Sequence, residues 1–172
     1  NFGIEVENLH KYRIVYQGLS EGLHEFDFDV DNQFFENLEY SEIKKGDLKV
    51  HLVLNKKSTF LELDFHINGN VELVCDRCLD EYIQAIDYEG KLFVKFSDSE
   101  EDLAEDVICL SPSEHELDIT HYIYESINLS IPLKRVHPDD EDGNSTCNPE
   151  MLKRLNNLEI DEPADDTIDP RW

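Results

Sequence analysis

Basic residues are scarce in this sequence. Lysine and arginine together number 15, against 40 aspartate and glutamate residues, so the formal net charge is −25 at pH 7. Charge-driven binding to nucleic acid needs many lysine and arginine side chains to displace counterions, so this binding mode is disfavoured. The electrostatic field of a protein with this negative charge attracts basic proteins instead, and we therefore expect a basic partner. Solubility at high salt is the alternative explanation of the acidity.

Long apolar runs are missing, and cysteines are few. No stretch of about 18 apolar residues occurs, so we expect no transmembrane helix. The first residues show no basic segment followed by an apolar stretch, so no secretory signal is expected. Four cysteines in 172 residues are too few for a disulfide scaffold. A reducing, cytoplasmic location is the simplest interpretation.

The usual motifs of enzymes and RNA-binding sheets are absent as well. The sequence contains no glycine-rich phosphate loop and no aromatic–basic motif of the kind found in RNA-recognition sheets. Its histidines are scattered, and no serine–histidine–aspartate order can be assigned. The sequence therefore predicts a protein that is not an enzyme.

Alternation of apolar and polar residues dominates the first part of the chain. It predicts strands over residues 12–16, 24–30, 48–54, 60–67, 71–75, 82–88 and 92–96. Short turns are expected between them, for example at Gly69 and Asn70, and a short helix capped by Asp31 or Asn32 interrupts them. Such alternation is typical of antiparallel strands with one buried and one wet face, so we expect a sheet of about six strands.

Helical periodicity appears only later in the chain. Asp118 is a suitable N-cap for a helix over residues 118–129, which carries Ile123 and Ile127 on one apolar face. Before it, the acidic run 98–106 predicts a solvated loop, and Val107–Leu110 predicts an edge strand. The fold class expected is therefore α+β, a mainly antiparallel sheet with this helix packed against it and an acidic tail at the end.

The last part of the sequence differs in composition from the rest. We expect an α+β domain over residues 1–135 and an acidic C-terminal extension over 136–172, packed or mobile. Pro149 is suited to the first turn of a short helix with a small apolar stripe. From Glu159 onward the acidic, proline-containing composition favours an extended or disordered end.

Cys75 and Cys78 lie two residues apart, where a hairpin turn is expected. Zinc prefers a tetrahedron of thiolates and imidazoles, and such a turn supplies two thiolates to one ion. His137 and Cys147, in a polar loop far downstream, would complete a four-ligand site with a looser spacing than in zinc fingers. An ordinary hairpin turn without metal is the competing hypothesis. A redox pair is disfavoured because acidic residues follow Cys78 and no helix begins at the first cysteine.

The ordered motifs resemble those of a known family. Residues 71–79, Val-Glu-Leu-Val-Cys-Asp-Arg-Cys-Leu, are similar to the central signature of the YceD family, also called large ribosomal RNA subunit accumulation protein. Residues 118–133, followed by His137 and Cys147, resemble its second signature: an acidic helix start, a leucine–proline segment, then histidine and cysteine. The acidic segment between His137 and Cys147 is longer than the family pattern.

The resemblance implies a bacterial cytoplasmic protein, without enzymatic activity, that is needed for normal accumulation of large-subunit ribosomal RNA. Genes of the family often lie beside one for a small, basic ribosomal protein. Together with the charge of −25, this predicts a ribosome-biogenesis factor that binds a basic ribosomal protein or a pre-ribosomal particle. A direct RNA-binding factor is the alternative, and a thiol oxidoreductase is a third. The RNA-binding alternative would use Lys44, Lys45, Lys56, Lys57, Lys134 and Arg135.

Overall fold

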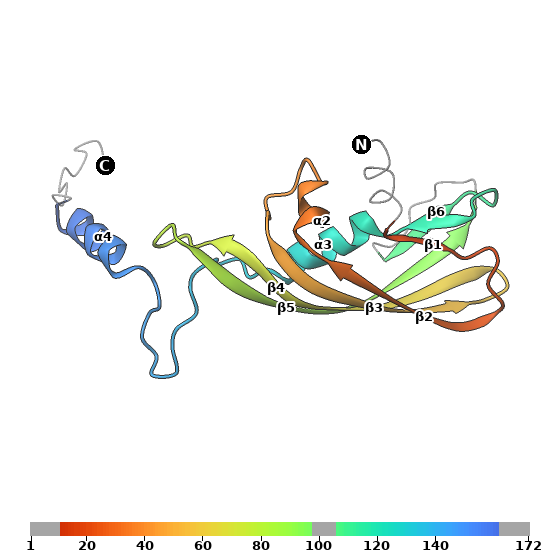
Figure 1. Ribbon diagram of the computed structural model, residues 1–172, viewed down its shortest axis with the longest axis horizontal. Helices are drawn as coiled ribbons and strands as arrows, with labels where there is room; N and C mark the ends of the chain where they lie inside the picture. The colour runs from red at the N-terminus through yellow and green to blue at the C-terminus, as the bar shows by residue number, and fades with distance from the viewer. Residues whose placement is uncertain (1–10, 98–105, 162–172) are drawn as a thin grey trace, which may run out of the picture. The chain divides into compact units, whose positions relative to one another are not determined.

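The computed structural model describes residues 11–97 and 106–161 (Figure 1). The chain divides into two compact units, of which the first comprises Asn1–Glu72 and Gln84–Pro132. The second comprises Leu73–Ile83 and Leu133–Trp172. Most of the predicted acidic loop 98–106, and the tail after residue 161, lie outside the described residues. That residues 1–135 act as a domain and 136–172 as its extension stays a prediction.

A five-stranded sheet with the order β2-β3-β4-β5-β6 dominates the structure. Its strands are β2 (Gly22–Val30), β3 (Gly46–Lys56), β4 (Phe60–Val74), β5 (Glu81–Phe96) and β6 (Val107–Leu110). β3 pairs with β2 and β4 in antiparallel fashion, whereas β6 lies at the edge and pairs with β5 in parallel. A second sheet pairs β1 (Arg13–Val15) with β7 (Glu116–Asp118). The predicted α+β class and the edge strand are confirmed.

Two long strands replace four of the shorter ones that the sequence predicted. The expected turn at Gly69 and Asn70 is wrong, because Gly69 pairs with Leu48 inside the continuous β3–β4 ladder. Gly69 has a φ of +146°, and a Cβ at this position would lie 2.3 Å from the carbonyl oxygen of Asp47. The glycine therefore permits close approach of two strands and does not end one of them.

The core lies on one side of the sheet. β3 buries its even-numbered side chains from Leu48 to Leu54, and β4 buries Leu61, Leu63, Phe65 and Ile67. Helix α3 (Thr120–Ser130) runs along this side (Figure 1) and buries Ile123 and Ile127, while the Tyr122 ring lies 4.5 Å from that of Phe65. The predicted helix and its packing against the sheet are thus present.

The observed N-caps of the helices agree only in part with those predicted from the sequence. Asp31 caps the short helix α2 (Asn32–Glu36), as predicted, by accepting a hydrogen bond from the amide of Phe34. The N-cap of α3 is Ile119 and not Asp118, although the Asp118 carboxylate accepts a hydrogen bond from the Thr120 amide over 2.9 Å. Asp118 belongs to β7, and its pairing with Arg13 delays the helix start.

Helix α4 (Pro149–Asp161) belongs to the second unit. It begins at Pro149, as predicted, but continues through Asp161, where the sequence indicated an extended end from Glu159 onward. Its apolar stripe is partly exposed, since Leu155 is 37% and Leu158 is 65% accessible. Within the described residues, no helix has both the length and the apolar character needed to cross a membrane.

Candidate metal centre

The turn between β4 and β5 has a tight, hydrogen-bonded geometry. The amide of Cys75 donates to the carbonyl of Asp80 over 2.8 Å, and the amide of Leu79 donates to the carbonyl of Cys75 over 2.9 Å. Leu79 has a φ of 64°, in the left-handed region that costs non-glycine residues about 1–2 kcal/mol. This backbone turns both cysteine side chains to the same side, and both are buried.

The segment after Pro132 is attached to this turn through Asp76 and Arg135. The amide of Asp76 donates to the carbonyl of Arg135 over 2.7 Å, and the amide of Arg135 donates to the Asp76 carboxylate over 3.2 Å. A further link joins the side chains of Asn148 and Asp80 over 2.9 Å. These hydrogen bonds bring His137 and Cys147 beside the cysteine turn, as the sequence hypothesis required.

The acidic segment between His137 and Cys147 folds into a closed loop. Asp139 and Ser145 form an isolated antiparallel bridge, and the Thr146 hydroxyl donates to the carbonyl of Pro138 over 2.6 Å. At the tip, Gly143 adopts a φ of +82°. Because the loop returns on itself, the additional residues are accommodated without moving Cys147 away from His137.

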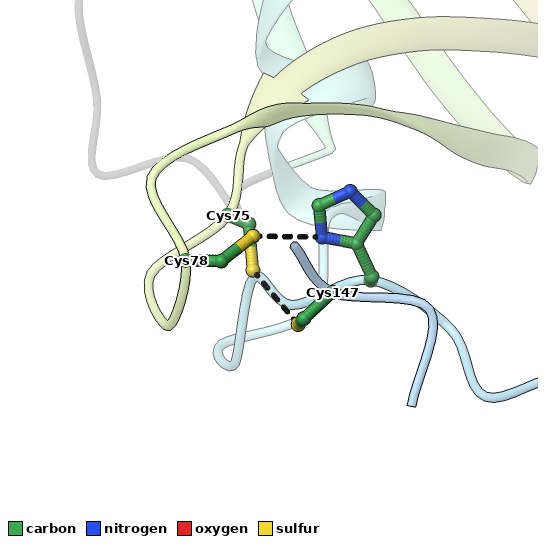
Figure 2. A group of neighbouring side chains, drawn as sticks. Cys75, Cys78 and Cys147 are labelled. Atoms are coloured by element: carbon green, nitrogen blue, oxygen red, sulfur yellow. Dashed lines mark hydrogen bonds between the residues drawn. The ribbon is translucent and has the colours of Figure 1, made fainter. Parts of the chain in front are cut away.

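The four predicted ligand residues converge. One ligand atom from each of Cys75, Cys78, His137 and Cys147 lies within 4.8 Å of every other. The Sγ atoms of Cys75 and Cys147 are 3.7 Å apart, and Cys78 Sγ is 3.4 Å from His137 Nδ1 (Figure 2). A zinc tetrahedron has edges of about 3.8 Å between two sulfurs and about 3.6 Å between sulfur and nitrogen. These two separations therefore match tetrahedral edges, and the four residues are close enough together to hold a metal ion.

The redox hypothesis finds less support in this geometry. The cysteines are free thiols, and a disulfide would need an S–S distance of about 2.05 Å. The three cysteines of the cluster are buried, with accessibilities of 0%, 1% and 4%, whereas reactive cysteines are typically accessible.

The surroundings favour thiolate at one position in particular. Burial alone raises the pKa of the Cys75 thiol, but hydrogen bonds from the backbone of Cys78, from His137 and from the backbone of Arg77 outweigh it and lower the pKa. At Cys147, burial and the neighbouring sulfurs raise the pKa. A bound cation would require both groups as thiolates, so binding would release a proton chiefly from Cys147.

Tyr82 is a residue of the centre that sequence reasoning did not single out. Its ring lies 5.3 Å from the His137 imidazole, and burial raises the pKa of its hydroxyl. That hydroxyl is buried and has no hydrogen-bond partner among residues 11–97 and 106–161. In the sequence, the alternation of β5 places Tyr82 on the buried side of the strand, which predicts burial but not contact with a ligand residue.

The four lysines of the RNA-binding alternative that lie in the first unit do not form one patch. Lys44 and Lys45 precede β3, whereas Lys56 ends it and Lys57 follows, so the two pairs lie roughly 35 Å apart by the rise of an extended strand. The Lys56 ammonium donates to the carbonyls of Tyr16, Gln17 and Leu19. Lys56 therefore stabilises the fold and is poorly placed for phosphate contacts.

Comparison with known proteins identifies a family for this chain. The family model described as large ribosomal RNA subunit accumulation protein YceD matches residues 63–172, which is more than half of the chain. No curated protein and no solved structure matches the chain. The matched range includes all four residues of the cysteine–histidine cluster.

Proposed function

Because the chain belongs to the YceD family of large ribosomal RNA subunit accumulation proteins, we propose that it is a cytoplasmic, non-enzymatic ribosome-biogenesis factor. It binds a basic ribosomal protein, free or within a pre-ribosomal particle. The observation that carries the choice of partner is the net charge of −25, since such a field attracts cationic proteins and repels RNA phosphates. The separation of the two lysine pairs at opposite ends of β3 counts against direct RNA binding.

We further propose that Cys75, Cys78, His137 and Cys147 hold a structural zinc ion. Four protein ligands leave no open coordination position, so the ion has no catalytic role. Its contribution is to fasten the segment after Pro132 to the turn of the second unit, because an unfolded chain has no preformed site. The convergence of the four ligand atoms within 4.8 Å supports this role.

A pull-down from a ribosome-containing lysate tests the choice of partner. The bait is the full chain, an unrelated protein of similar acidity is the control, and each lysate is divided into nuclease-treated and untreated portions. We expect a basic ribosomal protein to be retained in both portions and not by the control. Loss of every partner after nuclease treatment would favour the RNA-binding alternative, and retention of the same proteins by the control would show only unspecific attraction.

A further inference from the structure

One side of the five-stranded sheet in the first unit is left open. Helix α3 covers the side that carries the core, and no described element of this unit lies over the opposite side (Figure 1). We call the outward side chains of β2–β5 in this unit, centred on His51 and His66, the open face. Its carboxylates reach well into solvent, since the Asp27 side chain is 81% and the Asp87 side chain 78% accessible.

The open face carries more acids than bases. Its carboxylates include Glu25, Asp27 and Asp29 on β2, Asp64 on β4, and Asp87 and Glu89 on β5. Its lysines are Lys49, Lys91 and Lys95. Lys49 is hydrogen-bonded to Asp29, and Lys91 bonds to Glu62 over 2.7 Å, so these two lysine charges are already matched by neighbouring carboxylates. The remaining charge of the face is negative.

A row of carboxylate–imidazole pairs crosses the face. Asp27 lies opposite His51, and His51 lies opposite His66, in consecutive strand pairs. Each imidazole is hydrogen-bonded to a carboxylate over 2.8 Å, His51 to Asp27 and His66 to Asp87. The row fixes these carboxylates in place, and the imidazole rings offer flat surfaces on which a guanidinium group can stack.

Two hollows flank the histidine pair, and both include His51 and His66 in their walls. One, of about 390 Å³, is also lined by Asp27, Asp29, Asn68 and the Asp29-paired Lys49. The other, of about 430 Å³, is also lined by Val53, Asp64, Glu89 and the Glu62-paired Lys91. Each hollow thus combines carboxylates with flat or apolar surface, the combination that accepts the stem and the charged head of a lysine or arginine side chain.

We propose that the open face binds an extended lysine- and arginine-rich segment of a protein partner, with basic side chains entering the two hollows beside His51 and His66. The inference deepens the proposed function by placing the acidic surface that receives the basic partner. A single metal ion fits this face less well, because Asp27 and Asp87 are separated by three strand spacings, about 14 Å, and do not converge.

Binding of a fluorescent oligo-arginine peptide to the full chain, followed by anisotropy at low salt, tests the proposal. The variant Asp27→Asn/Glu89→Gln removes one carboxylate from each hollow. The matched control, Glu36→Gln/Glu39→Gln, removes the same charge from exposed positions at and beyond the end of α2. We expect the first variant to bind at least about fivefold more weakly and the control to change affinity less than about twofold.

Equal weakening in both variants would overturn the proposal, because it would show attraction by the overall charge alone, and so would unchanged binding in both. If Asp27→Asn/Glu89→Gln melts at a lower temperature than the parent chain, the pair Asp29→Asn/Asp64→Asn, which again removes one carboxylate from each hollow, replaces it with the same expected result. This test does not depend on the pull-down. If the pull-down retains a basic protein but the open-face substitutions do not selectively weaken peptide binding, the proposed site is rejected while the proposed function still stands.

Discussion

Replacing Cys147 by serine should release the loop from the turn of the second unit while leaving the first unit intact. The substitution removes one of the four candidate ligands, and Cys109→Ser is the matched control because Cys109 lies in β6, outside the cluster. Serine is nearly isosteric with cysteine but is a poor zinc ligand. The two variants therefore differ in metal binding and not in bulk.

The magnitude follows from the contacts that hold the loop. The hydrogen bonds of Asp76 with Arg135 and of Asp80 with Asn148 contribute about 0.5–1.5 kcal/mol each. Ordering the backbone of residues 133–148 costs on the order of 1 kcal/mol per residue, which exceeds that contribution several-fold. Binding of a structural zinc ion supplies about 10 kcal/mol or more. Without it, the amides of Asp76 and Arg135 should exchange with solvent freely.

Hydrogen–deuterium exchange, combined with elemental analysis of protein purified without a polyhistidine tag, measures both effects. We expect about one equivalent of zinc in the parent and in Cys109→Ser, and less than about half in Cys147→Ser. Exchange at Asp76 and Arg135 should accelerate in Cys147→Ser, while amides of β3 stay protected. Unchanged protection at Asp76 and Arg135 in metal-free protein would refute the reasoning, since the hydrogen bonds alone would then hold the loop.

Three further perturbations test the local account. Leu79→Gly should raise the free energy of unfolding by about 1 kcal/mol in thermal melts, because glycine tolerates the φ of 64° and Leu79 is exposed; a loss of stability would contradict this. Gly69→Ala should lower the free energy of unfolding by more than about 2 kcal/mol, because the alanine Cβ would lie 2.3 Å from the Asp47 carbonyl oxygen. An unchanged melting temperature would contradict this, since it would show that β3 and β4 separate locally at little cost. His51 should titrate by NMR with a pKa above 6.5, chiefly because its hydrogen bond with Asp27 raises the pKa, and Asp27→Asn should reduce that shift. The stabilisation of the folded state by the His51–Asp27 pair is thus present below pH 6.5 and is lost as the pH rises through the raised pKa of His51. A His51 pKa that is the same in the parent and in Asp27→Asn would contradict the pairing.

Patterns of period two and the identities of the cysteine and histidine side chains predicted much of the sheet and the composition of the cluster. Side-chain alternation reports burial directly, so the strands and the inward phase of Leu48 to Leu54 were recoverable. Soft ligands are rare enough that Cys75, Cys78, His137 and Cys147 formed a specific hypothesis, and the structure brings these four together.

Other features depend on contacts that a sequence does not display. Glycine is common in turns, so the sequence predicts a turn at Gly69, but in the structure Gly69 pairs with Leu48 inside a strand and lies close to Asp47. The side chain of Asp118 suits an N-cap, so the sequence predicts one there, but pairing with Arg13 holds Asp118 in β7. The row of Asp27, His51 and His66 depends on strand register, which alternation alone does not fix.

The ratio of large-subunit to small-subunit ribosomal RNA, measured in cells that lack this gene, tests the central claim most directly. Supplying the parent chain or Glu36→Gln/Glu39→Gln should restore the ratio of normal cells. Asp27→Asn/Glu89→Gln, produced at the same level, should leave the ratio below that of normal cells, because the variant binds the basic partner more weakly. A low ratio that the parent chain itself fails to restore would contradict the account.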